Sequence, residues 1–120
     1  MLRDAPIRPV ANDLPRKWLM DDYLELVVWY APEGNAAGFE LIYDRMNRPR
    51  SIRWLPGQEA RHYAVDGGED NPGKNRSPML LADGAPDLPR IREEFSLRSR
   101  DLPQYLQEFV SLRLASLSFP

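Results

Sequence analysis

The clearest structural signal in this chain is the stretch YLELVVWYAPEGNAAGFELIYD, residues 23–44. Residues 23–30 and 38–44 are rich in β-branched and aromatic side chains, which favours extended strands. Between them, Pro32-Glu33-Gly34-Asn35 is typical of a turn. The stretch therefore predicts a β-hairpin at the start of a sheet.

Shorter strand-like segments follow this hairpin along the chain. Residues 51–55 (SIRWL) and 61–66 (RHYAVD) each predict one strand, and residues 78–83 (PMLLAD) predict a short fifth strand or an edge segment. The connections are too short for parallel crossovers, which need a dozen or more residues. We expect an antiparallel meander of four to five strands over residues 21–83.

The apolar period changes from two to 3.6 residues after this region, which indicates helices. The first helical stripe contains Leu88, Ile91 and Phe95, and the second contains Leu102, Tyr105, Leu106, Phe109, Val110 and Leu117. Two C-terminal helices within residues 87–118, packed on one face of the sheet, give an α+β fold. At 120 residues, the chain suits a single domain covering residues 1–120.

The tripeptide Asp-Leu-Pro begins at positions 13, 87 and 101, and each copy predicts a helix start. Asp101 with Gln104 also resembles a capping box. The copy at position 13 predicts only a short helix that runs through Trp18 and Leu19. Residues 1–12 contain prolines and show no period, which predicts a loose N-terminal arm.

Alternation along the hairpin separates the side chains onto two faces. The core face, which we expect beneath the helices, carries Leu24, Leu26, Val28 and Tyr30 on one strand and Phe39, Leu41 and Tyr43 on the next. Val27, Trp29 and Ile42 make the opposite face partly apolar as well. Because two helices cover one face only, we expect this second face to be covered by the arm with Trp18, by a second copy of the chain, or by a protein partner.

The composition limits the possible functions. The 42% hydrophobic and 28% charged content are ordinary for a soluble globular domain. The absence of cysteine excludes disulfides, Cys-ligated zinc and thiol catalysis, and it suits the cytoplasm. We find no apolar run long enough for a signal peptide or a membrane span, so we expect a cytoplasmic protein.

The charged residues fall into two blocks. Residues 21–44 carry only acidic charges, and residues 45–61 carry five arginines against Glu59 alone. Neighbouring strands would place these opposite charges beside each other. The arginines near Trp54 leave nucleic acid as a minor alternative, but the aromatic residues of the hairpin lie among acids, which disfavours base stacking.

One segment resembles a nucleotide-binding loop. GEDNPGKN, residues 68–75, fits G-x-x-x-x-G-K-[ST] except at Asn75. Pro78 follows instead of the helix that such a loop must open, and Asp66, Glu69 and Asp70 would repel phosphate. The acids also lack the spacing of a calcium loop. We therefore expect no nucleotide, no metal and no cofactor.

His62 is the only histidine. An alternative function is a small enzyme or ligand-binding protein that uses His62 with Asp66 or Glu69 as its orienting carboxylate. In an extended strand, His62 and Asp66 share a face but lie about 13 Å apart. The simpler interpretation is an ordinary surface histidine.

A scattered set of core and turn residues resembles a known protein family. The set comprises Trp29-Tyr30, Gly38-Phe39-x-Leu41-x-Tyr43-Asp44, Trp54, Val65-Asp66-x-Gly68-Glu69 and Pro78-x-Leu80-x-x-Asp83-Gly84. It resembles a family of small bacterial proteins with no assigned activity, over residues 21–115. The resemblance implies a small bacterial cytoplasmic protein and supplies no catalytic or ligand-binding residues.

The leading functional hypothesis is a non-enzymatic, self-associating interaction or accessory module. Its expected docking surface is the second sheet face with Val27, Trp29 and Ile42. The expected partner is a second copy of the chain, forming a homodimer, or another protein.

Overall fold

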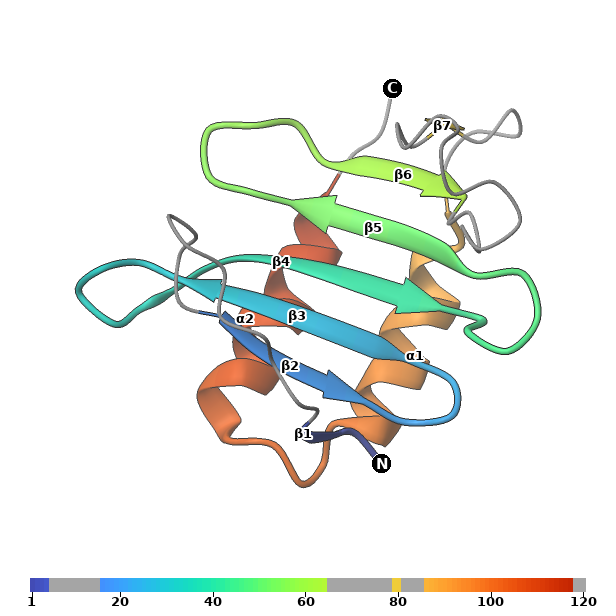
Figure 1. Ribbon diagram of the computed structural model, residues 1–120, viewed down its shortest axis with the longest axis horizontal. Helices are drawn as coiled ribbons and strands as arrows, with labels where there is room; N and C mark the ends of the chain where they lie inside the picture. Colours follow the sequence, from blue (N-terminus) through green and yellow to red (C-terminus); the bar gives the residue numbers. More distant parts are fainter. Residues whose placement is uncertain (5–15, 65–78, 81–85, 118–120) are drawn as a thin grey trace, which may run out of the picture.

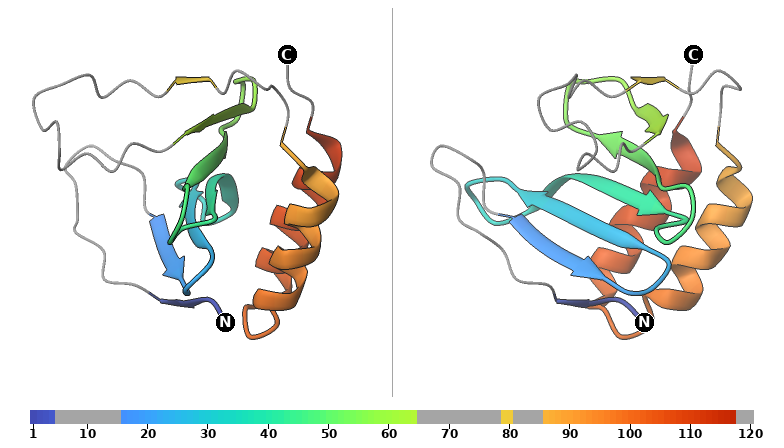
Figure 2. Two further views of the ribbon diagram at one scale, coloured as in Figure 1. Left: turned by 90° about the vertical axis from the view of Figure 1, so that its right-hand side faces the viewer. Right: turned by 45° about the vertical axis from the view of Figure 1, so that its right-hand side comes forward.

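A curved sheet and a pair of helices form the two layers of this protein (Figure 1). The computed structural model describes residues 1–4, 16–64, 79–80 and 86–117. Within these residues an antiparallel sheet of seven strands follows the chain order from β1 to β7. Both helices pack on the same side of it, as the side view in Figure 2 shows. The predicted α+β meander with two C-terminal helices is confirmed.

The strand bounds differ from the predicted ones mainly at the N-terminal end. The strands are β1 (Arg3–Asp4), β2 (Arg16–Met20), β3 (Glu25–Tyr30), β4 (Ala36–Tyr43), β5 (Arg50–Trp54), β6 (Arg61–Ala64) and β7 (Met79–Leu80); the helices are α1 (Leu88–Arg98) and α2 (Gln104–Ser116). The prediction of four to five strands was too low, because the sheet already begins before residue 21. Residues 65–66, 78 and 81–83 of the predicted strands lie outside the described residues.

β2 replaces the short helix that the sequence predicted. All five of its residues pair with β3 in antiparallel register, and Leu19 lies opposite Leu26. Leu19 is only 2% exposed on the core side of the sheet. A helix of one or two turns is marginal on its own, whereas pairing with β3 satisfies the backbone groups of the segment. Residues 13–15, which carried the helix signal, lie outside the described residues.

The prediction of a loose arm is wrong for its first residues. Leu2 is 3% exposed, and its N–H donates to the carbonyl oxygen of Arg98 at 3.0 Å. Arg3 and Asp4 pair with Met20 and Leu19 of β2. Residues 2–4 therefore belong to the fold, and residues 5–12 of the predicted arm lie outside the described residues.

The core lies between the sheet and the helices, as the alternation predicted. Its buried apolar residues from the sheet and helices include Leu24, Leu26, Val28, Phe39, Leu41, Tyr43, Ile52, Ile91, Phe95, Leu106, Val110 and Leu114. Two details of the α2 stripe were wrong, because Tyr105 is 52% exposed and the unpredicted Leu114 is fully buried. Tyr105 instead reaches the end of β3, where its hydroxyl lies 3.0 Å from that of Tyr30.

Of the two predicted C-terminal helix starts, only the first has a side-chain cap. Asp87 Oδ1 accepts a hydrogen bond from the N–H of Arg90 at 3.3 Å. α2 begins after Pro103 without a side-chain cap, so the predicted capping by Asp101 is wrong. The Gln104 side chain donates instead to Glu108 at 2.9 Å. Neither described helix has the length and apolar character needed to cross a membrane.

A buried carboxylate fastens α1 to the turn between β2 and β3. Asp21 Oδ1 accepts hydrogen bonds from the N–H groups of Tyr23 and Leu24, both at 2.8 Å. Its Oδ2 lies 3.1 Å from Arg98 Nη1 near the end of α1. Burial alone would raise the pKa of Asp21, but the two backbone hydrogen bonds and Arg98 outweigh it and lower the pKa. The native fold therefore stabilises the charged form of the Asp21 carboxylate.

Candidate protein-binding face of the sheet

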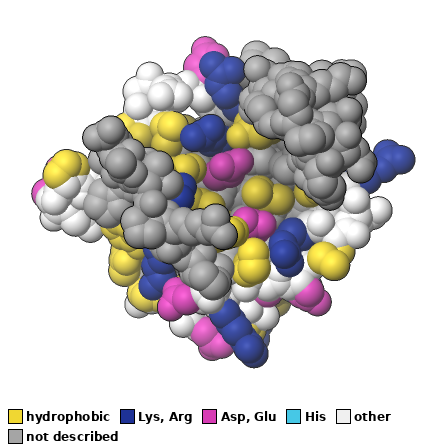
Figure 3. All heavy atoms as spheres, in the orientation of Figure 1, with side chains coloured by type: hydrophobic (Ala, Val, Ile, Leu, Met, Phe, Trp, Pro, Cys, Tyr) yellow, Lys and Arg dark blue, Asp and Glu magenta, His cyan; other side chains and the backbone are white. Residues whose placement is uncertain are grey.

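The side of the sheet away from the helices, called the outer face below, is the main candidate site. Register and alternation place on it Arg16, Trp18, Met20, Glu25, Val27, Trp29, Gly38, Glu40, Ile42, Ser51, Arg53, Arg61 and Tyr63. Figure 3 looks onto this side and shows hydrophobic side chains interspersed with acidic and basic ones. The outer face is therefore mixed rather than uniformly polar.

The three residues predicted as an interaction surface all lie on the outer face. Trp29 is buried, with 9% of its surface exposed, whereas Val27 and Ile42 are half-buried. Gly38 lies directly opposite Trp29 on β4. A Cβ atom at Gly38 would lie 2.8 Å from both the Trp54 carbonyl oxygen and Leu55 Cδ2, so only glycine fits there without displacement.

The acidic and basic blocks meet on this face, but only some of their members pair. Glu25 accepts a hydrogen bond from Trp18 Nε1 at 2.8 Å and forms an ion pair with Arg45 at 3.5 Å. Arg50, from the same basic block, pairs in register with Tyr43, whose side chain faces the helices. The arginines thus divide between the two faces and form no continuous basic surface for nucleic acid.

Glu40 occupies the centre of the outer face. Its Oε2 accepts hydrogen bonds from Ser51 Oγ at 2.6 Å and from Tyr63 Oη at 3.0 Å. Burial and then the negative charge of Glu40 raise the pKa of the Tyr63 hydroxyl, which therefore remains a donor. The carboxylate is thus held toward β5 and β6.

Arg53 extends in the opposite direction. It lies opposite Glu40 in the β4–β5 register, yet its guanidinium sits over the ring of Trp29, 5.3 Å from the ring centroid. Among the described residues no carboxylate forms an ion pair with Arg53 or with Arg61, its cross-strand neighbour on β6. The Nε of Arg53 is also buried without a hydrogen-bond partner. Two cations therefore lie side by side without an acidic partner from the described part of the chain.

His62 lies on the other side of the sheet, so the prediction of a surface histidine is wrong. The side chain is 5% exposed, and its Nε2 lies 2.5 Å from the hydroxyl of Tyr43. The two rings are parallel, with centroids 5.9 Å apart. Asp66 and Glu69, the proposed carboxylate partners, lie outside the described residues. Sequence reasoning missed Tyr43 as a partner, although register places both side chains on the helix side.

A charged cluster at the start of α1 borders the Tyr43–His62 pair. Arg90 donates to the hydroxyl of Tyr23, forms an ion pair with Asp44 at 3.7 Å and lies 5.8 Å from the ring centroid of Tyr43. Burial raises the pKa of the Tyr43 hydroxyl despite the neighbouring arginines. Since Tyr43 is 2% exposed, this cluster fastens α1 to the sheet rather than presenting a nucleophile to solvent.

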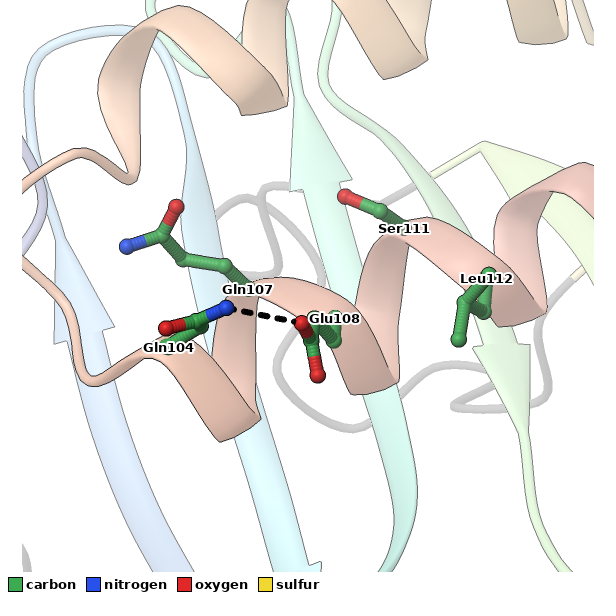
Figure 4. A pocket seen from close by; sticks show the side chains of 5 residues that line it. All are labelled: Gln104, Gln107, Glu108, Ser111 and Leu112. Atoms are coloured by element: carbon green, nitrogen blue, oxygen red, sulfur yellow. Dashed lines mark hydrogen bonds between the residues drawn. The ribbon is translucent and has the colours of Figure 1, made fainter.

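The helix side also has a shallow hollow, of about 530 Å3, along α2 (Figure 4). The described residues that line it are Gln104, Gln107, Glu108, Ser111 and Leu112, all from this one helix. Figure 4 shows the Gln104–Glu108 hydrogen bond at its edge. Among the described residues, no second element contributes to its lining, and the hollow is open to solvent rather than enclosed as a small-molecule site would be.

The residues of the nucleotide-like loop, Gly68 to Asn75, lie outside the described residues. Within the described part of the chain, no three imidazole or carboxylate side chains gather as metal ligands would. Comparisons of this chain with protein families, curated proteins and solved structures give no significant match. The resemblance to a small bacterial family remains a prediction.

Proposed function

We propose that this chain is a non-enzymatic interaction module that self-associates through the outer face of its sheet. The observation that carries the proposal is the set of side chains on that face. Trp18, Met20 and Arg53, which are half-buried there, belong to the residue types enriched at protein interfaces, whereas Trp29 and Tyr63 are already buried within the single chain. The half-buried Val27 and Ile42 add apolar surface among them.

The position of this face supports the same function. The helices cover the opposite side of the sheet (Figure 2) and bury the core there. An antiparallel sheet with one solvated face normally places polar side chains outward, whereas here apolar and aromatic residues recur on β2, β3 and β4. Docking of a protein surface would remove this apolar area from water.

A second copy of the chain is the partner that we propose for this face. An isologous interface requires a surface that complements itself. The outer face carries acidic Glu25 and Glu40 on β3 and β4, and basic Arg53 and Arg61 on β5 and β6. The net charge of −2 is also too small for strong repulsion between copies. The resemblance to a bacterial family further leads us to propose the bacterial cytoplasm as its location.

A charge placed on the outer face tests the proposal. Val27→Glu would bury a carboxylate in the interface, and we expect it to weaken self-association about tenfold or more. The matched control is Leu112→Glu, at a residue 70% exposed on α2, which should leave self-association unchanged. Light scattering after size-exclusion chromatography over a range of concentrations measures both. A wild-type chain that stays monomeric, or equal effects of the two variants, contradicts the proposal.

A further inference from the structure

Glu40 and Arg53 are neighbours of opposite charge that do not pair with each other. They lie directly opposite in the register of β4 and β5, on the same face. Glu40 is directed toward Ser51 and Tyr63, while Arg53 reaches back across β4 to the ring of Trp29 on β3. The two side chains thus pass each other, and each leaves its charge without an oppositely charged partner among the described residues.

Each group also retains unused hydrogen-bonding capacity. Ser51 and Tyr63 both donate to Oε2 of Glu40, and none of the described residues donates to its Oε1. The guanidinium of Arg53 lies over the Trp29 ring, and within the described part of the chain it forms no hydrogen bond or ion pair. A guanidinium and a carboxylate form a strong charge-assisted pair when their planes meet. The centre of the outer face therefore presents one donor and one acceptor group, displaced from each other by one strand.

We propose that the self-associated state is a two-fold dimer in which Arg53 of each copy pairs with Glu40 of the other. This inference rests on the proposed function and adds the geometry of the interface. A two-fold axis that runs between β4 and β5, parallel to the strands, places β4 of one copy over β5 of the other. Glu40 then faces Arg53 across the interface twice. The relation is fully reciprocal, as a closed isologous dimer requires.

The same axis positions the flanking residues favourably. The order across one row of the face is Trp18, Val27, Glu40, Arg53 and Arg61. Reversal about the axis places Arg61 of one copy over Val27 of the other, next to Trp18. The aliphatic stem of an arginine covers apolar surface, and its guanidinium binds aromatic faces. The exposed Arg61 thus gains an apolar and aromatic neighbour rather than a second cation.

A charge exchange between two variants tests this geometry. Arg53→Glu and Glu40→Arg should each weaken homodimer formation about tenfold or more, because like charges then meet across the axis. An equimolar mixture should recover dimers, since one copy now carries two acids and the other two bases. Native mass spectrometry distinguishes the mixed dimer from either homodimer. If each variant alone forms few homodimers and the equimolar mixture also stays monomeric, the proposed pairing is wrong.

Neutral variants show whether a loss of dimers comes from the missing charge rather than from a loss of folding. Glu40→Gln retains an acceptor for Ser51 and Tyr63, and Arg53→Gln removes only the charge and the ring contact. Both should weaken the wild-type dimer and remove its salt dependence, while Arg92→Gln on the exposed side of α1 should do neither. If the wild type dimerises and these variants do so equally well, the pairing is wrong while the proposed function stands. A monomeric wild type would instead reject the proposed function itself.

Discussion

Asp21 shows how one residue can connect three parts of this molecule. Its carboxylate is 5% exposed and receives two backbone N–H groups from the β2–β3 turn and one guanidinium from α1. The backbone carbonyl of the same residue accepts a hydrogen bond from Arg45 Nη1 at 2.7 Å. Loss of the side chain would leave the N–H groups of Tyr23 and Leu24 without this acceptor, whereas Arg98 would retain Glu94 and Asp22.

We predict that Asp21→Ala lowers the free energy of unfolding by about 2–4 kcal/mol, because two backbone donors lose their acceptor and Arg98 loses its most buried acidic partner. Urea unfolding measures this loss. Asp22→Ala is the matched control, since Asp22 also contacts Arg98 but its side chain is 87% exposed. It should cost less than about 1 kcal/mol. Equal losses for the two variants would contradict the role of Asp21.

The pH dependence of stability should also depend on Asp21. Its pKa in the folded protein is lowered below the ordinary value of 3.8. The stability that it contributes is therefore complete above pH 3.8 and is lost as the pH falls through the folded-state pKa. The difference in unfolding free energy between wild type and Asp21→Asn should shrink as the pH is lowered from neutral into this acidic range. A constant difference across that range would contradict the prediction.

At the scale of the elements, β4 and β5 approach each other closely at Gly38. A Cβ there would lie 2.8 Å from a backbone carbonyl oxygen, which cannot rotate away as a side chain could. We predict that Gly38→Ala destabilises the fold by about 1–3 kcal/mol, because the two strands must separate locally. Gly34→Ala is the comparison, since its Cβ would meet nothing within 4 Å and only its φ of 101° opposes the change. Thermal unfolding of both variants should show the larger loss for Gly38→Ala, and the reverse order would contradict it.

Strands and helices whose apolar residues recur regularly along the chain could be predicted from the sequence. Elements that form only by pairing or packing with another segment could not. The alternation of Leu24, Leu26 and Val28 identified the buried face of the hairpin, and all three are fully buried. β2 was missed because its segment has too few residues to establish a period and follows a helix signal at position 13. Pairing with β3, and with β1 at its end, makes it a strand. His62 was misplaced for a similar reason, since its burial depends on Tyr43 and the core beyond it.

The candidate site was predicted in part. Alternation correctly placed Val27, Trp29 and Ile42 on the side of the sheet away from the helices. The roles of Glu40 and Arg53 could not be predicted, because their partners Ser51, Tyr63 and Trp29 come from other strands. Their separation in the chain gave no signal of these contacts, and only the register of the sheet brings them to one place.

For the whole molecule, the consequence of one-sided helix packing is a sheet whose two faces are stabilised differently. The helix side contains the continuous core, while the outer face carries half-buried apolar residues and charges with unused capacity. If a second copy covers this face, dimerisation and folding are thermodynamically linked. Stability must then depend on protein concentration, because mass action favours the dimer.

We predict that the midpoint temperature of wild-type unfolding rises by about 2–4 °C for each tenfold increase in protein concentration. The physical reason is that unfolding releases two chains from each dimer, so dilution favours the unfolded state. Calorimetry over about a hundredfold range of concentration measures the effect. Val27→Glu should unfold at a lower temperature than the wild type where the wild type is dimeric, and its midpoint should depend less on concentration, whereas Leu112→Glu should retain the full dependence. A concentration-independent midpoint in the wild type would show that the outer face is stable without a second copy, and self-association through it would have to be abandoned.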